Sequence, residues 1–196
     1  MEEKKEENTL VSIIVITYNS SKYVLETLES AKAQTYKNIE LIISDDCSTD
    51  DTFDVCEKWI NNNSDFFIRS KIVSASVNKG VAANCNLGFS LAKGNWIKLI
   101  AGDDILIKNC IETNINYLQK NRDANLIFSQ SEVFNSDTKE IISIRPDSEF
   151  KMPENQFYSL LKKDFVHAPT VFCKKSIYTK VGGFDERYPF MEDYPM

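Results

Sequence analysis

The sequence predicts an α/β fold in which helices cover both faces of a mostly parallel sheet. Three observations lead to this prediction. Short apolar or β-branched runs alternate with segments whose apolar residues recur at helical spacing, the pattern of strand–helix–strand units. The first run, residues 11–17 (VSIIVIT), is almost continuously apolar, which is typical of a strand buried on both faces. A polar cluster follows each of the first four runs, at the sheet edge where parallel sheets bind ligands.

Strands and helices are expected in alternation along the chain. The expected strands are residues 11–17, 39–44, 71–74, 96–100, 126–131, 141–144 and 169–173. The expected helices cover about 22–33, 81–92 and 107–120, and another follows Asp50 with Phe53, Cys56 and Ile60 on one face. Ser20 or Ser21 can cap the first helix, and Gly94 ends the helix over 81–92. No repeat or linker divides the chain, so one domain over residues 10–196 is expected.

Composition limits the possible classes of function. The chain of 196 residues has 42% hydrophobic and 27% charged residues, as in ordinary globular proteins. A net charge of −6 argues against nucleic acid as a partner, because nucleic-acid phosphates require a basic surface. A small anionic ligand stays compatible with this charge, since a metal ion or aligned backbone N–H groups can reverse the local sign.

Cysteine usage and the N-terminus indicate a cytoplasmic protein. Five cysteines without CxxC spacing favour neither a disulfide framework nor a zinc site. No apolar run reaches the roughly 20 residues that a membrane-spanning helix needs. Residues 1–9 are charged and lack the apolar core of a signal peptide, so a short disordered tail is expected there.

The polar clusters at the strand ends suggest a nucleotide and a metal ion. Neither a GxGxxG turn nor a GxxxxGK[ST] loop is present, so a bound diphosphate needs a divalent cation to neutralise it. Mg²⁺ and Mn²⁺ prefer hard oxygen ligands, which Asp103 and Asp104 offer directly after Gly102. The alternative is that Gly-Asp-Asp forms only a solvated turn.

Asp45 and Asp46 at the end of the second strand have two interpretations. One acid can accept a hydrogen bond from a ligand N–H such as a nucleobase imide, with the ring of Tyr18 beside it. Alternatively, the pair is only a turn before the second helix, with Ser48 or Asp50 as the helix cap, and Tyr18 only packs.

Three segments resemble family 2 glycosyltransferases of the GT-A fold. They are residues 11–52 (VSIIVITYNSSKYVLETLESAKAQTYKNIELIISDDCSTDDT), 78–104 (NKGVAANCNLGFSLAKGNWIKLIAGDD) and 181–196 (VGGFDERYPFMEDYPM). They keep the family's order and cover nearly the whole chain after the tail. The resemblance implies a Rossmann-like sheet with a nucleotide-binding half over about 10–104 and an acceptor-side half over about 105–196.

The resemblance also implies a function and a set of roles. It implies a metal-dependent, inverting, hexosyltransferase-type enzyme that moves a sugar from a nucleotide diphosphate, with a UDP-sugar expected, to a saccharide or lipid-linked acceptor in polysaccharide or cell-surface glycan synthesis. The implied nucleotide-binding residues are Thr17, Tyr18, Asn19, Asp46, Asn78, Lys79, Gly80, Asn84 and Asp103. Tyr18 would lie against the base and Asp46 would accept from its imide N–H. Asp104, with Asp103, would hold Mn²⁺ or Mg²⁺.

Three positions depart from the family pattern. Ala101 replaces the first acid of the usual Asp-x-Asp motif, which suggests a looser metal site or a ribose contact shifted to Asp103. Ile16 stands where a proline is usual, and Cys85 where an arginine is often found. The loss of that arginine leaves the metal, or Lys79, to compensate at the phosphates.

The resemblance places the catalytic base near the end of the chain. Inverting transfer needs a base for the acceptor hydroxyl, and the matching pair is Asp193 as base with Glu192 orienting it or the acceptor. An exposed acidic loop is the alternative reading of this pair. Gly182 and Gly183 are expected only to end a helix, and the lone His167 is expected to be structural.

Relatives usually continue beyond this point with helices that cover the acceptor or contact a membrane. The chain is therefore expected to be truncated at its C-terminus, with peripheral association at the inner face of the cell membrane through the missing part. The sequence does not indicate an oligomeric state. Two rival functions stay open: a nucleotidyltransferase, and a sugar-nucleotide-binding module without catalysis, for which Ala101 and the early end leave room.

Overall fold

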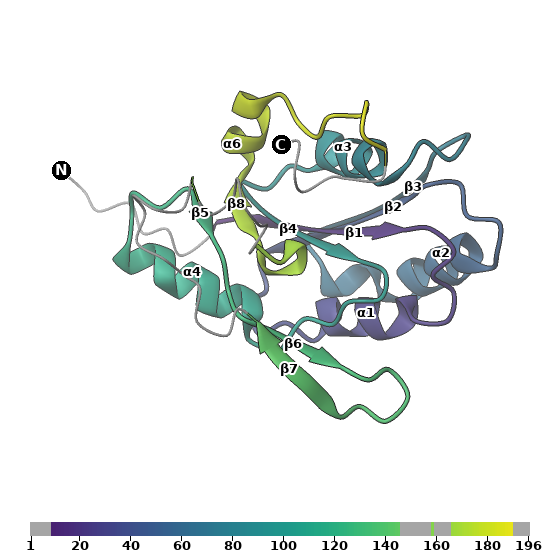
Figure 1. The fold of residues 1–196 in the computed structure, drawn as a ribbon, viewed down its shortest axis with the longest axis horizontal. Coiled ribbons are helices and arrows are strands. Elements are labelled where there is room, and N and C mark those ends of the chain that lie inside the picture. Colours follow the sequence, from purple (N-terminus) through teal and green to yellow (C-terminus); the bar gives the residue numbers. More distant parts are fainter. Residues whose placement is uncertain (1–8, 146–157, 159–165, 190–196) are drawn as a thin grey trace.

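The computed structural model describes residues 9–145, 158 and 166–189. Within these residues the centre of the fold is a six-stranded sheet with strand order β3-β2-β1-β4-β8-β5 (Figure 1). Its strands are β1 (Val11–Thr17), β2 (Ile39–Asp45), β3 (Arg69–Ser74), β4 (Trp96–Ala101), β5 (Leu126–Ile127) and β8 (Phe172–Lys174). A separate antiparallel pair consists of β6 (Ser131–Phe134) and β7 (Ile141–Arg145). The mostly parallel α/β sheet that the sequence predicts is confirmed.

Helices cover both faces of the sheet, as predicted (Figure 1). The α-helices are α1 (Val24–Lys32), α2 (Thr52–Asn63), α3 (Val81–Leu91), α4 (Cys110–Lys120) and α6 (Lys175–Val181), and the 3-10 turns are η1 (Ser64–Phe66) and η2 (Ala168–Thr170). Helices α1, α2 and α4 pack on one face, against Ile13 and Val15 of β1, whereas α3 packs on the other, against Ile14. Successive side chains of β1 therefore pack alternately into two hydrophobic cores, one on each face of the sheet. This explains why the sequence of β1 is continuously apolar.

The parallel register aligns the ends of the first four strands. Thr17 at the end of β1 pairs with Asp45 of β2, and Asp45 pairs in turn with Ser74 of β3. On the other side of β1, Ile16 pairs with Ala101 at the end of β4. Because the ends of these four strands agree to within one residue, the polar residues that follow them meet at one end of the sheet.

Several local predictions are wrong, among them the strand over 169–173, which is the 3-10 turn η2 followed by β8. The predicted strand over 126–131 divides into β5 and β6, and β8 lies antiparallel between β4 and β5. Helix α1 follows Tyr23 without a side-chain cap from Ser20 or Ser21. The carbonyl of Ser20 accepts from the N–H groups of Tyr23 and Val24, both at 2.9 Å, so the backbone takes the place of a side-chain cap.

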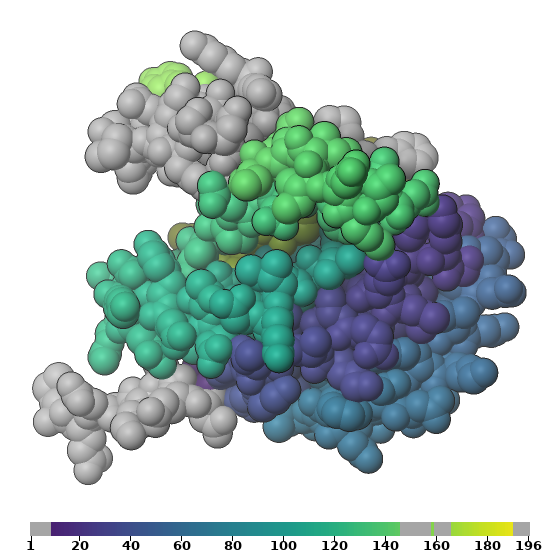
Figure 2. All heavy atoms as spheres, turned by 90° about the horizontal axis from the view of Figure 1, so that it is seen from below, coloured from purple at the N-terminus to yellow at the C-terminus, as the bar shows by residue number. Residues whose placement is uncertain are grey.

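The β6–β7 hairpin packs against the outside of α1. In Figure 2 the green hairpin lies beside the purple N-terminal part of the chain, and Lys139 Nζ is 2.6 Å from Glu26 Oε2. A second ion pair joins Lys22 and Asp137 at 4.0 Å. Both pairs are exposed, so they orient the hairpin and contribute little to stability. Within the described residues, every helix is too short or too polar to cross a bilayer.

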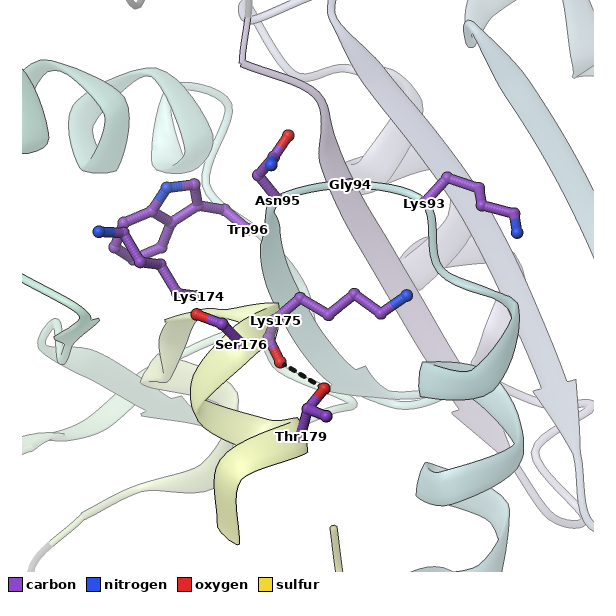
Figure 3. A pocket seen from close by; sticks show the side chains of 8 residues that line it. All are labelled: Lys93, Gly94, Asn95, Trp96, Lys174, Lys175, Ser176 and Thr179. Carbon is purple, nitrogen blue, oxygen red and sulfur yellow. Dashed lines mark hydrogen bonds between the residues drawn. The ribbon is translucent and has the colours of Figure 1, made fainter. Parts of the chain in front are cut away.

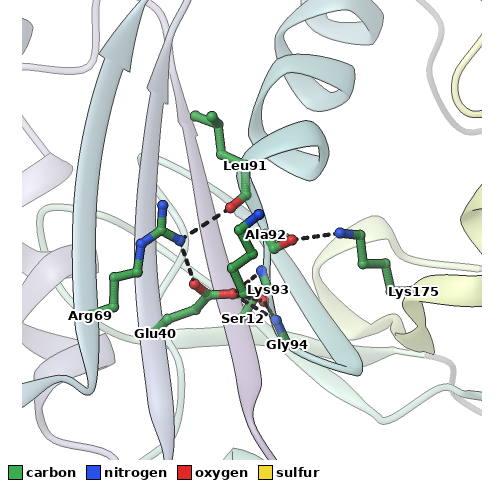
Figure 4. A network of polar contacts seen from close by, with 8 residues as sticks. All are labelled: Ser12, Glu40, Arg69, Leu91, Ala92, Lys93, Gly94 and Lys175. Atoms are coloured by element: carbon green, nitrogen blue, oxygen red, sulfur yellow. Dashed lines mark hydrogen bonds and ion pairs between the residues drawn. The ribbon is translucent and has the colours of Figure 1, made fainter.

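A buried carboxylate stabilises the opposite end of the sheet, at the N-terminal ends of the parallel strands (Figure 4). Glu40 of β2 is fully buried and accepts hydrogen bonds from Ser12 Oγ (2.5 Å), Arg69 Nη1 (2.8 Å) and Gly94 N (2.7 Å). The N–H of Lys93 is a fourth donor. Burial acts to raise the pKa of Glu40, but these donors outweigh it and hold the pKa below its ordinary value. Glu40 therefore joins β1, β2, β3 and the loop before β4.

Candidate functional site

The aligned strand ends enclose a pocket of about 390 Å³. Its lining residues are Ile16, Thr17, Tyr18, Ser20, Asp46, Asn78, Gly80, Val81, Asn84, Ala101, Gly102, Asp103 and Pro189. Seven of the nine residues predicted to bind a nucleotide are in this set. The structure thus brings all four strand-end clusters to one cavity, as the parallel register requires.

Asp45 and Asp46 face in different directions: Asp45 bonds within the fold, and Asp46 lines the pocket. The carboxylate of Asp45 is buried and accepts from the hydroxyls of Thr17 (2.8 Å), Ser48 (2.5 Å) and Ser74 (3.1 Å). It ties the first three strand ends together and is structural. Asp46 is the acid that reaches the pocket.

Asp46 also shapes the pocket through the loop before α3. Its Oδ1 accepts from Lys79 N at 2.9 Å and its Oδ2 from Gly80 N at 2.8 Å. The residue is only 3% exposed, so these charge-assisted bonds are shielded from water. Each carboxylate oxygen has a second lone pair, and a ligand N–H can still be accepted there. The predicted contact with a base imide stays a prediction.

Two further predicted residues mainly hold the pocket walls. The amide of Asn84, on α3, donates to Thr17 O at 3.2 Å and accepts from Ser44 Oγ at 2.7 Å. Asn19 has a positive φ of 50°, and its Oδ1 accepts from Thr49 N at 2.8 Å. Among the described residues, Asn19 and Lys79 lie beside the pocket without lining it. Tyr18, by contrast, is 48% exposed at the pocket, so its ring is open to a ligand.

The two acids after β4 are not equivalent. Asp103 is exposed and lines the pocket, whereas Asp104 is half-buried and its Oδ2 accepts from Ala101 N at 3.2 Å. Burial is the main cause that raises the pKa of Asp104, and the neighbouring charge of Asp103 adds to it. Beneath them, the buried Lys98 donates through Nζ to Pro169 O at 2.5 Å.

The two carboxylates after β4 fit a divalent cation that takes the rest of its ligands from a bound substrate and from water. Within the described residues, no three His, Cys, Asp or Glu side chains gather as a metal site. Mg²⁺ commonly takes only one or two carboxylates and fills its other positions with phosphate oxygens and water. Asp103 and Asp104 supply carboxylates of this kind, and the metal role of both stays a prediction.

The structure adds Pro189, which sequence reasoning missed. Pro189 lines the pocket, and its carbonyl accepts from Val81 N at 2.9 Å. Glu192 and Asp193, the predicted base pair, lie outside the described residues, as do residues 1–8 of the predicted tail. His167 is half-buried and its Nδ1 lies 3.1 Å from Ser131 Oγ, a contact that suits a structural residue.

A second pocket, of about 340 Å³, lies at the opposite edge of the sheet and contains none of the predicted site residues (Figure 3). Lys93, Lys174 and Lys175 are among its lining residues. Lys175 Nζ donates to Ala92 O at 2.5 Å, and Lys174 Nζ lies 5.7 Å from the ring centroid of Trp96. Two of these three ammonium groups thus already have partners within the fold.

Comparisons with known proteins support the family and the fold. The family described as glycosyl transferase family 2 matches residues 12–182. An uncharacterized glycosyltransferase of Rickettsia typhi is 30% identical over 191 residues, which cover 95% of this chain and 57% of the relative. The Escherichia coli enzyme UDP-Glc:alpha-D-GlcNAc-diphosphoundecaprenol beta-1,3-glucosyltransferase WfaP is 32% identical over 191 residues, covering 95% of this chain and 68% of WfaP. The chain thus spans little more than half the length of some relatives.

Solved structures show the same fold at lower identity. Staphylococcus aureus TarS 1–349 in complex with UDP has a TM-score of 0.70 and 23% identity, covering 94% of this chain and 52% of TarS 1–349. The mannosyltransferase PcManGT of Pyrobaculum calidifontis, in complex with GDP-Man and Mn²⁺, has a TM-score of 0.66 and 19% identity, covering 90% of this chain and 47% of PcManGT. The architecture is that of GT-A glycosyltransferases.

Proposed function

The chain belongs to glycosyl transferase family 2, and from this premise we propose that it transfers a sugar from a nucleotide diphosphate, a UDP-sugar, to a hydroxyl of a saccharide or lipid-linked acceptor. The observation that carries the proposal is the single pocket into which Tyr18, Asp46, Asn78 and Asp103 converge. A family match alone does not require these four side chains to share one cavity.

The pocket offers separate features for each part of a nucleotide. The exposed ring of Tyr18 provides a stacking face for the base, beside the carboxylate of Asp46 that can accept an imide N–H. A uracil imide is such a donor. The names of relatives support a UDP donor: WfaP is named for UDP-Glc and a diphosphoundecaprenol acceptor, and TarS structures hold UDP or UDP-GlcNAc.

The acids after β4 are proposed to lie at the diphosphate. Asp103 and Asp104 would hold Mn²⁺ or Mg²⁺, which neutralises charge on the leaving diphosphate. The backbone N–H of Ala101 fixes the orientation of the Asp104 carboxylate before any ligand arrives. Asp103 lines the pocket, and in this proposal it would contact the ribose or the metal.

We propose that the transfer is a single displacement with inversion. The acceptor oxygen forms a bond to the anomeric carbon while the bond from that carbon to the diphosphate oxygen breaks. The acceptor proton passes to Asp193, oriented by Glu192, and the nucleoside diphosphate leaves. These two acids follow Pro189, which itself lines the pocket, by three and four residues.

Calorimetric titration tests the donor and metal assignments. UDP, GDP, ADP and CDP are each titrated with and without Mn²⁺ into the wild type and into Asp104→Ala. The exposed Asp54 of α2 supplies the control, because Asp54→Ala removes the same charge away from the pocket. We expect manganese-dependent binding of UDP that Asp104→Ala loses and Asp54→Ala keeps. Failure of every nucleotide to bind the wild type would contradict the proposal.

A second variant separates an enzyme from a module that only binds nucleotide sugars. Asp193→Asn keeps the size of the side chain but removes the base. The assay measures UDP release from UDP-glucose, UDP-galactose and UDP-GlcNAc, with and without a saccharide acceptor. An enzyme loses turnover in this variant and retains UDP binding, whereas a binding module has no turnover in the wild type either.

A further inference from the structure

Asn86 of α3 makes an unusual set of contacts with a segment about a hundred residues further along the chain. Its Nδ2 donates to Phe184 O at 3.0 Å and to Glu186 Oε1 at 2.7 Å, and its Oδ1 accepts from Phe184 N at 3.0 Å. The hydroxyl of Tyr178 is a further donor to Oδ1. None of these contacts is with the pocket itself.

We propose that Asn86 is a positioning residue for catalysis. It attaches residues 184–189, which lead to the proposed base Asp193, to helix α3, and α3 forms one wall of the donor pocket. This inference rests on the proposed function. Asn86 is not proposed to touch the substrate, and it acts only through the position of residues 184–189.

The contacts of Asn86 fix the segment in one orientation. Its amide pairs with both the N–H and the C=O of Phe184, as a neighbouring β-strand would. A backbone N–H can meet only an acceptor and a backbone C=O only a donor, so the amide of Asn86 cannot rotate by 180° without losing both bonds. Burial raises the pKa of Tyr178 to about 12, which keeps its phenol protonated as a donor to the same amide.

The turn before the segment is built for this close approach. Helix α6 ends at Val181; its C-cap Gly182 has a φ of 90°, and Gly183 follows with a φ of 83°. A Cβ on Gly183 would lie 2.8 Å from the Tyr178 hydroxyl and 3.0 Å from Asn86 Oδ1. The two glycines therefore reverse the chain directly against Asn86, where any side chain would be strained or in collision.

A second attachment joins the far end of the segment to the pocket. Pro189 O accepts from Val81 N at 2.9 Å, in the first turn of the helix that carries Asn86. Between the two attachments the chain is largely exposed, and Arg187 and Tyr188 face solvent. Within the part of the chain that the structure describes, two polar attachments to α3 and the buried ring of Phe184 therefore set the course of this segment.

The catalytic consequence follows from the length of chain that remains. Three to four extended residues span at most roughly 11–14 Å, so the position of Pro189 limits where Glu192 and Asp193 can lie. A displacement of about 1 Å in a reacting group can reduce turnover by about a hundredfold. Release of Phe184 from Asn86 should therefore lower turnover more than it lowers donor binding.

The test compares Asn86→Ala with Gln34→Ala. Gln34 is a matched control, because its buried amide also joins distant segments: Nε2 donates to Ser30 O (3.1 Å) and Ile107 O (2.9 Å), and Oε1 accepts from Ile111 N (3.1 Å). Gln34 lies on the other face of the sheet, away from the donor pocket. A purely structural effect would act alike in both variants.

We expect Asn86→Ala to lower kcat about tenfold or more, while the KM for the UDP-sugar changes less than about threefold. Gln34→Ala should leave kcat per folded molecule unchanged. Asn86→Asp, which keeps the side-chain size but turns a carboxylate toward Phe184 O and Glu186, should lose as much turnover as Asn86→Ala and guards against a cavity effect. Wild-type kcat in folded Asn86→Ala or Asn86→Asp would overturn the inference.

Hydrogen exchange keeps the test separate from the proposed function. In the absence of ligand, Asn86→Ala should speed amide exchange at residues 184–189 and Gln34→Ala should not. If the wild type neither binds UDP nor releases it from any UDP-sugar, the proposed function fails, and exchange still decides whether Asn86 holds the segment. Unchanged exchange at 184–189 in Asn86→Ala would overturn the inference whatever the activity.

Discussion

Gly80 in the donor pocket is expected to be intolerant of even one added methyl group. Its φ of 91° and ψ of 167° lie in a region that only glycine adopts readily. A Cβ at this position would lie 2.3 Å from Pro189 O and 2.6 Å from Pro189 Cβ. Gly80→Ala therefore combines backbone strain with a collision against backbone atoms, which cannot move aside as a flexible side chain would.

The structure allows the cost of Gly80→Ala to be worked out. The backbone strain contributes about 1–3 kcal/mol. Relief of the collision requires Pro189 O to retreat by about 1 Å, which breaks its hydrogen bond with Val81 N at a further cost of about 0.5–1.5 kcal/mol. The sum is about 1.5–4.5 kcal/mol. For a chain of this length it lowers the Tm by roughly 3–18 °C.

Gly182→Ala is the matched control for backbone strain alone. Gly182 has a φ of 90° and ends α6, but a Cβ there would meet nothing within 4 Å. Its cost is about 1–2 kcal/mol, and nucleotide affinity should not change. Thermal unfolding and UDP titration on both variants decide the matter. If Gly80→Ala is no less stable than Gly182→Ala and binds UDP like the wild type, the contact between Gly80 and Pro189 has no energetic role.

Three further outcomes are expected from buried carboxylates. Glu40→Ala leaves buried donors without an acceptor and should lower the free energy of unfolding by about 3–5 kcal/mol, measured by urea denaturation, while the exposed Glu57→Ala should be close to neutral. The pKa of Glu40 is lowered in the folded state, so its stabilising effect is complete above the unfolded pKa of about 4.3 and is lost as the pH falls through the folded pKa. Glu40→Gln should flatten this dependence of the unfolding free energy on acid pH. An unchanged acid profile in Glu40→Gln would contradict the lowered pKa. Asp46→Asn turns an amide N–H₂ toward Lys79 N or Gly80 N and should weaken UDP binding about tenfold or more, with Asp54→Asn as the control in the same titration.

Much of the sheet was predictable because its strands are buried on both faces. The range 11–17 for β1 is correct at both ends, and β2 and β4 each extend only one residue beyond the predicted range. A strand near β8 was predicted, but its place in the sheet was not predictable, because it depends on pairing between β4 and a segment 74–78 residues later along the chain. A three-residue strand carries too little pattern to reveal its partner or its direction.

The candidate site was predictable as a location and less so in its details. Strand ends in parallel register bring Tyr18, Asp46 and Asp103 together, and sequence periodicity is enough to see this. Sequence alone does not show that Asp46, and not Asp45, faces the pocket. This is decided by the hydroxyl groups that bind Asp45, which come from two strand ends (Thr17 and Ser74) and one loop (Ser48). Nothing in the sequence around Pro189 indicates that it lines the pocket. The related feature is Gly80, which has a positive φ and no side chain where Pro189 comes close.

The strand order has a consequence for how the protein is made. Among the described residues, β5 joins the sheet only through β8, and β8 pairs with the outer edge of β4. As the ribosome releases the chain, β1 to β4 can assemble first, but the outer edge of β4 stays unpaired until Phe172 emerges. An open strand edge is a template for pairing with other chains. Newly synthesised chains that stall before Phe172 should therefore aggregate through β4, and this stretch is where a chaperone would be needed.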